Sequence, residues 1–310
     1  MSRLLAVSAA LALGTPFVAT AADITRVASS FEDDDPFGLF IDVGLEHSER
    51  RTRILREVTV LGTSEPRQLL PELQYSSYDT RLNIDVAAGI SRDVEFSFGL
   101  PVVLFRNEYW GIAPGHNERT VAAEGLFTPP TSAYRIGLGN ARFGLAWAIF
   151  NQLKDDTKPT WVARIDYEAP TAAVLDPSLD TVNGPRTPVG DRVHKYSLST
   201  ALSRRIGVAD PYFKMFWTIP VRGPGVYNNC QHRELLVQGA NCSSPDWPSS
   251  ETGINSPHIV GAVFGSEFEV FRSPHQKFTL DVRFMNNYVG EGRYYNDLSG
   301  ALRQIGRAHV

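Results

Sequence analysis

Charged side chains occupy alternate positions along several apolar segments of this 310-residue chain. In residues 78–90, one alternate set is Tyr, Thr or aliphatic, and the other is polar or small. A period of two places these sets on opposite faces of a β-strand. We expect the charged faces to enclose a lumen, where mixed charges could line a water-filled pore or bind a polar solute. The candidate lumenal residues are Asp79, Arg81, Asp85, Glu95, Arg142, Arg164, Asp166, Glu168, Lys214, Glu267, Asp281 and Arg283.

The same charged residues could instead pair across strands and fill a narrow interior. If the connection between Phe150 and Thr160 closes symmetrically, Arg142 lies opposite Glu168 and can form a cross-strand ion pair. A narrow lumen crossed by such pairs conducts poorly unless a plug or a loop moves. The pattern therefore favours selective passage over a general porin, with an interior filled by ion pairs as the alternative.

The two cysteines lie in the longest expected connection. Eleven residues separate Cys230 from Cys242, and we expect them to form a disulfide in an exported protein. In the chain-entropy model, closing such a loop contributes about 3 kcal/mol. A redox pair is the alternative, but the close C-x-x-C spacing is absent.

Residue types that support catalysis do not occur in a recognisable arrangement. The histidines lack metal-ligand spacing such as H-E-x-x-H, and no Ser-His-Asx set can be identified from the sequence. We therefore expect no catalysis, no metal and no cofactor. A barrel-embedded lipid-modifying enzyme remains a minor alternative, which requires a Ser or Asp beside a His near the outer leaflet.

Composition and charge exclude several classes of protein. Hydrophobic residues make up 43% of the chain and charged residues 21%, which indicates a folded protein. The chain has 30 Lys and Arg against 34 Asp and Glu, a net charge of -4. This balance argues against a nucleic-acid partner, which needs a basic face.

The N-terminal residues resemble an export signal. Arg3 precedes an apolar run from Leu4 to Leu13, and Ala19-Thr20-Ala21 provides an A-x-A cleavage site. We interpret residues 1–21 as a signal peptide. No later apolar run approaches the ~20 residues of a spanning helix. If the mature chain enters a membrane, it must therefore cross it as strands.

The strands that must position these side chains follow from the alternation. The nine predicted strands lie within residues 39–45, 78–90, 94–104, 143–149, 161–167, 196–202, 213–221, 260–268 and 278–284. Their connections alternate in length, as in outer-membrane barrels, which have short periplasmic turns and long external loops. The short links are 91–93, 153–159, 207–210 and 273–276, and the long ones are 51–73, 107–134, 172–191 and 223–257.

A soluble lipocalin-like barrel shows the same alternation with its apolar row inside. The export signal, the loop asymmetry and two groups of aromatic residues near the strand ends favour lipid contact. We therefore predict an all-β fold, a transmembrane antiparallel up-and-down β-barrel in the outer membrane. Its expected partners are outer-membrane lipid, lipopolysaccharide and a small-molecule solute.

The expected domain division follows from these features. Residues 22–36 are predicted to be a periplasmic N-terminal segment and residues 37–303 the barrel. Residues 304–310 lack a strand pattern and match the translation of a common sequencing adapter, so we expect the native C-terminal strands to be missing. Because bacterial single-chain barrels have even strand numbers, the complete barrel is expected to have about ten to twelve.

Four short motifs carry a resemblance to a known family. They are Gly89-Ile90-Ser91-Arg92-Asp93, Phe98-Gly99-Leu100-Pro101, Gly137-Leu138-Gly139-Asn140 and Glu168-Ala169-Pro170-Thr171-Ala172. Over residues 75–290 the chain resembles the meta-pathway phenol-degradation outer-membrane barrels, although that family commonly has Asp at the place of Asn140 and Gly at that of Ala172. The resemblance implies passage of small hydrophobic or aromatic compounds. The alternative is a plugged structural barrel whose long loops bind partners.

Overall fold

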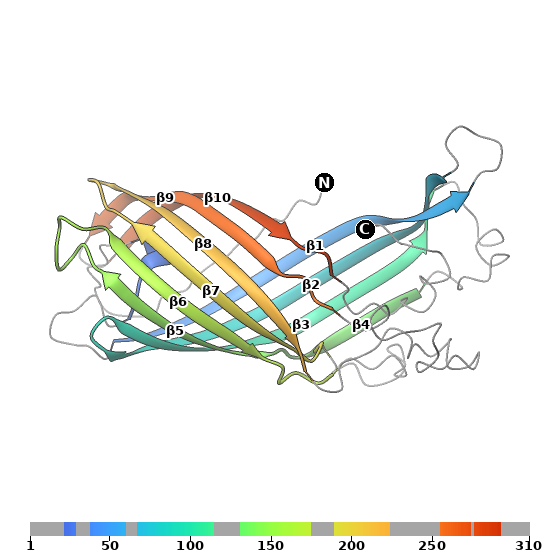
Figure 1. Ribbon diagram of the computed structural model, residues 1–310, viewed down its shortest axis with the longest axis horizontal. Helices are drawn as coiled ribbons and strands as arrows, with labels where there is room; N and C mark the ends of the chain where they lie inside the picture. The colour runs from blue at the N-terminus through green and yellow to red at the C-terminus, as the bar shows by residue number, and fades with distance from the viewer. Residues whose placement is uncertain are drawn as a thin grey trace.

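The protein forms one antiparallel sheet that curls into a half-barrel (Figure 1). The computed structural model describes residues 22–28, 38–59, 67–114, 131–174, 189–223, 255–273 and 276–292. The strands are β1 Leu39–Thr59, β2 Arg67–Ser91, β3 Val94–Ile112, β4 Thr131–Leu138, β5 Ala141–Phe150, β6 Thr160–Ala169, β7 Val193–Ser203, β8 Ala209–Arg222, β9 Ile259–Ser273 and β10 Gln276–Val289. A single 3-10 turn, η1 Asp23–Thr25, precedes them.

The strands pair in sequence order, so the predicted all-β, up-and-down arrangement is confirmed. The order is β1-β2-β3-β5-β6-β7-β8-β9-β10, and β4 pairs with β3. All nine predicted segments lie in strands. The connections β2–β3, β5–β6, β7–β8 and β9–β10 correspond to the four predicted short links and lie at one end of the sheet, which we call the short-turn end. Among the described residues, no helix is long and apolar enough to cross a membrane.

Strands β4 and β5 act as one bent strand beside β3. The β3 residues Val94–Gly99 pair with β5, and residues 102–110 pair with β4. At the bend, the Gly139 amide donates to the Pro101 carbonyl oxygen at 2.8 Å, and a Cβ at Gly139 would lie only 2.8 Å from Pro101 Cγ. The sequence prediction missed β4, because the first half of this strand, residues 131–134, lay in the expected long connection 107–134.

Strands β1, β2 and β3 extend far beyond the rest of the sheet (Figure 1). At about 3.3 Å per residue, β2 with its 25 residues spans about 80 Å, against about 33 Å for β5 or β6 with 10 residues. The prediction of a loop over residues 51–73 was wrong for most of that range. Backbone pairing continues there without an alternating apolar row, and that row was the only signal the prediction used.

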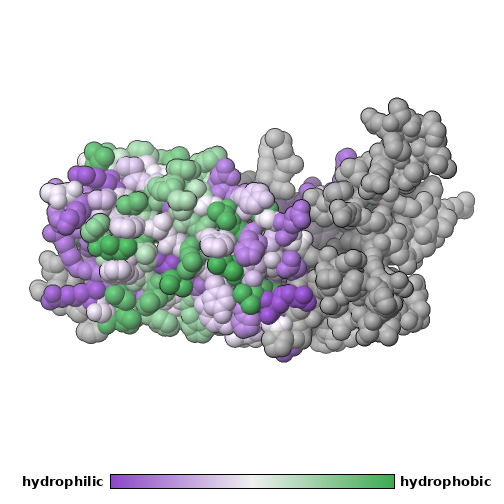
Figure 2. Space-filling view, viewed as in Figure 1, coloured by the Kyte–Doolittle hydropathy of each residue, from purple (hydrophilic) through white to green (hydrophobic). Residues whose placement is uncertain are grey.

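The two faces of the sheet differ in chemistry. The large apolar side chains of the alternating rows point outward and are exposed, including Ile41, Phe98, Leu145, Ile165 and Leu198. Figure 2 shows hydrophobic residues gathered over the middle of the strands in view. The charged rows lie on the concave face. This is the reverse of a soluble sheet, which buries its apolar row.

Candidate functional site

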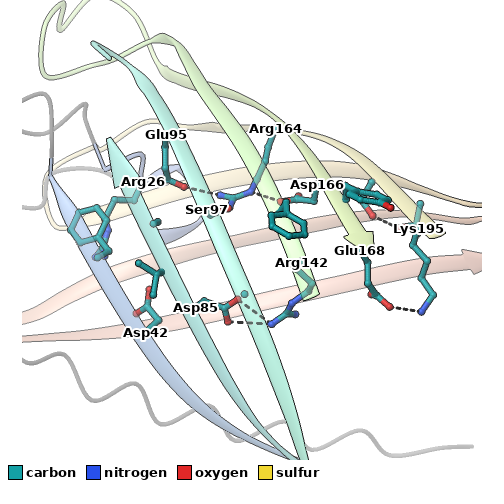
Figure 3. Close-up of a pocket in the computed structure, with 18 of the residues that line it drawn as sticks. Arg26, Asp42, Asp85, Glu95, Ser97, Arg142, Arg164, Asp166, Glu168 and Lys195 are labelled. Carbon is teal, nitrogen blue, oxygen red and sulfur yellow. Dashed lines mark hydrogen bonds and ion pairs between the residues drawn. The ribbon is translucent and has the colours of Figure 1, made fainter. Parts of the chain in front are cut away.

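The concave face holds a cavity of about 500 Å³ (Figure 3). Residues of seven strands, β1 to β3 and β5 to β8, line it together with two residues of the N-terminal segment 22–28. Six carboxylates and four cationic groups line it: Asp23, Arg26, Asp42, Asp85, Glu95, Arg142, Arg164, Asp166, Glu168 and Lys195. The lining is therefore rich in charge of both signs.

Arg142 reaches across a strand to its ion-pair partner. Its backbone lies opposite Glu168, as the symmetric closure predicted. The ion pair, however, forms with Asp85, with Nη2 3.1 Å from Oδ1. The predicted Arg142–Glu168 pair was wrong, because Glu168 has Lys195 directly opposite on β7 and pairs with it at 2.8 Å.

Arg164 is the centre of the largest polar network in the cavity. Its Nε donates to Asp166 Oδ1 at 2.9 Å, its Nη1 to Glu95 Oε1 at 3.2 Å and its Nη2 to Ser97 Oγ at 2.6 Å. The planar guanidinium thereby uses all three nitrogens in fixed directions. Glu95 is only 3% exposed, so this network is built into the wall.

A glycine keeps the space that this network occupies. Ser97, Gly144 and Asp166 lie in register on β3, β5 and β6. A Cβ at Gly144 would collide with the Ser97 hydroxyl and lie 3.1 Å from Arg164 Nη2. The missing side chain therefore lets polar groups from β3 and β6 meet over β5.

A second cluster lies farther from the short-turn end. Asp79 is buried and accepts hydrogen bonds from Arg81 Nη2 at 2.7 Å and from Arg106 Nε at 2.8 Å. Two guanidinium groups therefore share the Asp79 carboxylate. Asp79 and Arg81 were expected on this face, whereas Arg106 lay between the predicted strand 94–104 and the expected loop 107–134.

The remaining predicted lumenal residues lie on β8 to β10. Tyr212 donates its hydroxyl to Asp281 Oδ1 at 2.6 Å, and Arg283 forms an ion pair with the same carboxylate. Glu267 accepts a hydrogen bond from the Asp23 amide at 2.7 Å. Lys214 is half-buried, and alternation puts it on the same face as Tyr212.

Of the predicted set, Asp85, Glu95, Arg142, Arg164, Asp166 and Glu168 line the cavity, and the other six lie outside it.

The sequence analysis missed four charged residues of the cavity: Asp23, Arg26, Asp42 and Lys195. The alternation of β1 and β7 puts Asp42 and Lys195 in the polar rows, so the same signal could have found them. Nothing in the sequence marks Asp23 and Arg26, because residues 22–28 have no strand pattern. Arg26 stacks on Phe40, with its guanidinium carbon 3.8 Å from the ring centroid.

Among the described residues, no group of three or more His, Cys, Asp or Glu side chains is placed to hold a metal ion. Two described histidines make side-chain hydrogen bonds on the strands, His47 with Thr80 and His194 with Tyr167, both at 2.7 Å. Cys230 and Cys242 lie outside the described residues, so the disulfide stays a prediction, as does the adapter origin of residues 304–310.

No family model matches the chain. No curated protein matches it either. Among solved structures, the chain is similar to the alcaligin outer membrane receptor FauA from Bordetella pertussis, with a TM-score of 0.31 and 10% sequence identity. The similarity covers 83% of this chain and 41% of that one, so the chain spans about two fifths of that receptor's length. Membership of the phenol-degradation family stays a prediction.

The cavity combines fixed charges with an aromatic surface. Most of its charges have partners within the wall, but the Phe40 ring and the polar groups around it also face the space. Paired charges exchange partners at modest cost when each is half-exposed, as Asp85 and Arg142 are. The arrangement can therefore receive a small solute that offers both a ring and a polar or charged group.

Proposed function

We propose that this chain forms the wall of an outer-membrane β-barrel that admits small solutes through a charged lumen. The observation that carries the proposal is the opposition of the two faces. Strand β6 presents Ile165 outward at 55% exposure and holds Arg164 and Asp166 inward in a hydrogen-bonded network. Hydrocarbon outside and water inside are the surroundings that such a wall matches.

Aromatic side chains near both ends of the strands support this orientation. At the short-turn end Phe150 packs against Trp161, with ring centroids 5.7 Å apart. Toward the long connections Tyr167 stacks on Tyr196 at 5.0 Å. Amphipathic rings favour the two membrane interfaces, so the apolar rows between them match the hydrocarbon layer. The predicted signal peptide agrees with export to that membrane.

For the solute we propose small aromatic compounds that carry a polar or ionised group. The resemblance to phenol-degradation barrels suggests the ring, and the cavity supports the polar group, because its lining holds ten charged side chains. A purely aliphatic solute would displace water from these charges without replacing the hydrogen bonds. The proposal involves no catalytic step and no cofactor.

Uptake into liposomes tests the proposal. Vesicles containing the purified protein are given benzoate, phenol or a neutral sugar of similar size. We expect faster uptake of benzoate and phenol than of the sugar, and slower benzoate uptake by Arg164→Gln. Lys154→Gln is the matched control, because Lys154 pairs with Asp93 in a short turn, away from the cavity. Equal uptake by protein-free vesicles would contradict the proposal.

A plugged barrel without transport is the second candidate, and one observation favours it. Residues 22–28 lie against the concave face at the short-turn end, where Ala22 and Val27 are completely buried. If this segment never moves, the lumen stays closed. Persistent absence of uptake and of conductance in planar bilayers would support this candidate instead.

A further inference from the structure

The N-terminal segment Ala22–Ala28 crosses the concave face from one side of the half-barrel to the other. Ala22 packs against Tyr212 and Val263, at the β8–β9 side. Farther along, Ala28 is held on β3. Between these ends, Thr25 contacts Ser203 of β7 and Val27 packs against β5 and β6, while Arg26 reaches past β3 to Phe40 of β1. The blue segment in Figure 1 lies inside the curve of the sheet, near the short-turn end.

Two carboxylates hold the ends of this segment. Glu267 on β9 accepts a hydrogen bond from the Asp23 amide, and Glu95 on β3 accepts one from the Ala28 amide, both at 2.7 Å. Bonds from amides to ionised acceptors are stronger than neutral ones. The concave wall thus carries an anchor on each side that fits the backbone of this segment.

The middle of the segment fits a recess made by small residues. Val27 is completely buried and packs against Ala146, Ala148 and Val162 of β5 and β6. The alanines replace the polar residues found elsewhere in the concave rows, so the wall is shaped for an apolar side chain here.

A hydroxyl pair adds a direct side-chain contact between segment and wall. Thr25 Oγ1 lies 2.7 Å from Ser203 Oγ, and both residues are buried. This contact joins η1 to the short-turn end of β7.

The segment also forms part of the cavity. Asp23 and Arg26 line it, and Glu95 links the two structures, because its Oε2 accepts from Ala28 while its Oε1 accepts from Arg164. An anionic solute that draws Arg164 away from Glu95 removes one of the two hydrogen bonds that position the Glu95 carboxylate, and the other oxygen of this carboxylate holds Ala28. Occupancy of the cavity is therefore coupled to the hold on the segment.

We propose that segment Ala22–Ala28 is a gate that closes the short-turn mouth of the lumen and opens when a solute occupies the cavity. The inference rests on the proposed transport function. In the closed state the segment bridges the wall through Glu95, Ser203 and Glu267. Solute release toward the short-turn end requires these contacts to break.

A reversible crosslink tests the gate. Thr25→Cys and Ser203→Cys replace two hydroxyls already in contact, in a protein with Cys230→Ser and Cys242→Ser. We expect oxidation to lower benzoate uptake into liposomes by roughly ten-fold or more, since the lock removes the open population, and reduction to restore it. The Thr25→Cys single variant in the same background is the control, and its uptake should not respond to oxidation.

A second variant loosens the gate instead of locking it. Glu267→Gln weakens the anchor of Asp23 and should raise uptake, whereas Glu269→Gln, whose carboxylate pairs with Arg205 at 2.7 Å, should not. Circular dichroism checks that each variant keeps its strands. Fully crosslinked protein that transports as fast as reduced protein would overturn the gate alone. Absence of uptake in every state, including Glu267→Gln, would overturn both the gate and the transport function.

Discussion

Asp85 and Arg142 form an ion pair across β3, although their own strands, β2 and β5, are not neighbours in the sheet. Gly99 lies in register between them. A Cβ at Gly99 would collide with Asp85 Oδ1 and lie 3.2 Å from Arg142 Nε. The pair therefore depends on a residue that contributes no side chain.

Replacing this glycine should uncouple the pair. A double-mutant cycle of Asp85→Asn and Arg142→Gln, measured by urea unfolding, should give a coupling free energy of about 0.2–1 kcal/mol, as for half-exposed pairs. In a Gly99→Ala background this coupling should vanish. Gly44→Ala is the matched control, because a Cβ there meets nothing within 4 Å. Equal coupling in both backgrounds would refute the role of Gly99.

Removing one cavity cation should shift ion selectivity toward cations. The cavity has six carboxylates and four cationic groups, and Arg142→Gln leaves three of the latter. A unit charge acting over ~10 Å of water contributes about 0.4 kcal/mol, which corresponds to about a two-fold change in the permeability ratio. The reversal potential in a KCl gradient measures it. Lys154→Gln, in the short turn between β5 and β6, should leave the reversal potential unchanged. If Lys154→Gln shifts the potential as much as Arg142→Gln does, the short-turn end and not the cavity determines the selectivity.

A charge on the convex apolar surface should destabilise the protein in lipid. Ile165 lies in the middle of β6 and Ile206 in a short turn, with exposures of 55% and 66%. Ile165→Lys should lower the free energy of unfolding in vesicles by about 2–4 kcal/mol, the cost of a lysine at the bilayer midplane. Ile206→Lys should change it by less than about 0.5 kcal/mol. Near-zero effects of both would support a soluble barrel.

The turn between β5 and β6 should resist acid. Hydrogen bonds from the Thr157 side chain, from Lys158 and from the Thr157 amide lower the pKa of Asp155 to about 2. Because the folded state lowers this pKa, the ionised Asp155 stabilises the turn at pH values above the unfolded pKa of 3.8. This stabilisation is lost as the pH falls through the folded pKa of about 2. Thr157→Ala should raise the pKa, which carboxyl NMR in micelles can follow. An unchanged pKa would contradict the assignment.

Alternation predicted the strands that carry an apolar row, because one face of each meets a different medium from the other. It identified Ile165, Arg164 and their neighbours on the correct sides of β6. It could not identify the outer parts of β1 and β2, where backbone pairing continues but apolar residues do not alternate with polar ones. The partner of Arg142 was mispredicted, because a cross-strand rule considers adjacent strands and ignores the gap above Gly99.

The position of segment 22–28 has no sequence signal at all. Its seven residues are mixed in polarity and show no period, so the sequence predicts only a periplasmic N-terminal segment. What determines its position is the complementary wall: the alanines at 146 and 148, and the carboxylates of Glu95 and Glu267. Such a recess can be recognised only after distant strands have been brought together.

The crossing of this segment also bears on the width of the tube. Strands are spaced about 4.8 Å apart, so the five steps from β3 to β9 measure about 24 Å along the wall. The two anchored amides, those of Asp23 and Ala28, are five residues apart and can be separated by at most about 18 Å. A tether of this length, fastened at both ends, fixes how tightly the wall can bend. The curvature of the half-barrel is then set partly from within, by a short peptide that belongs to none of its strands.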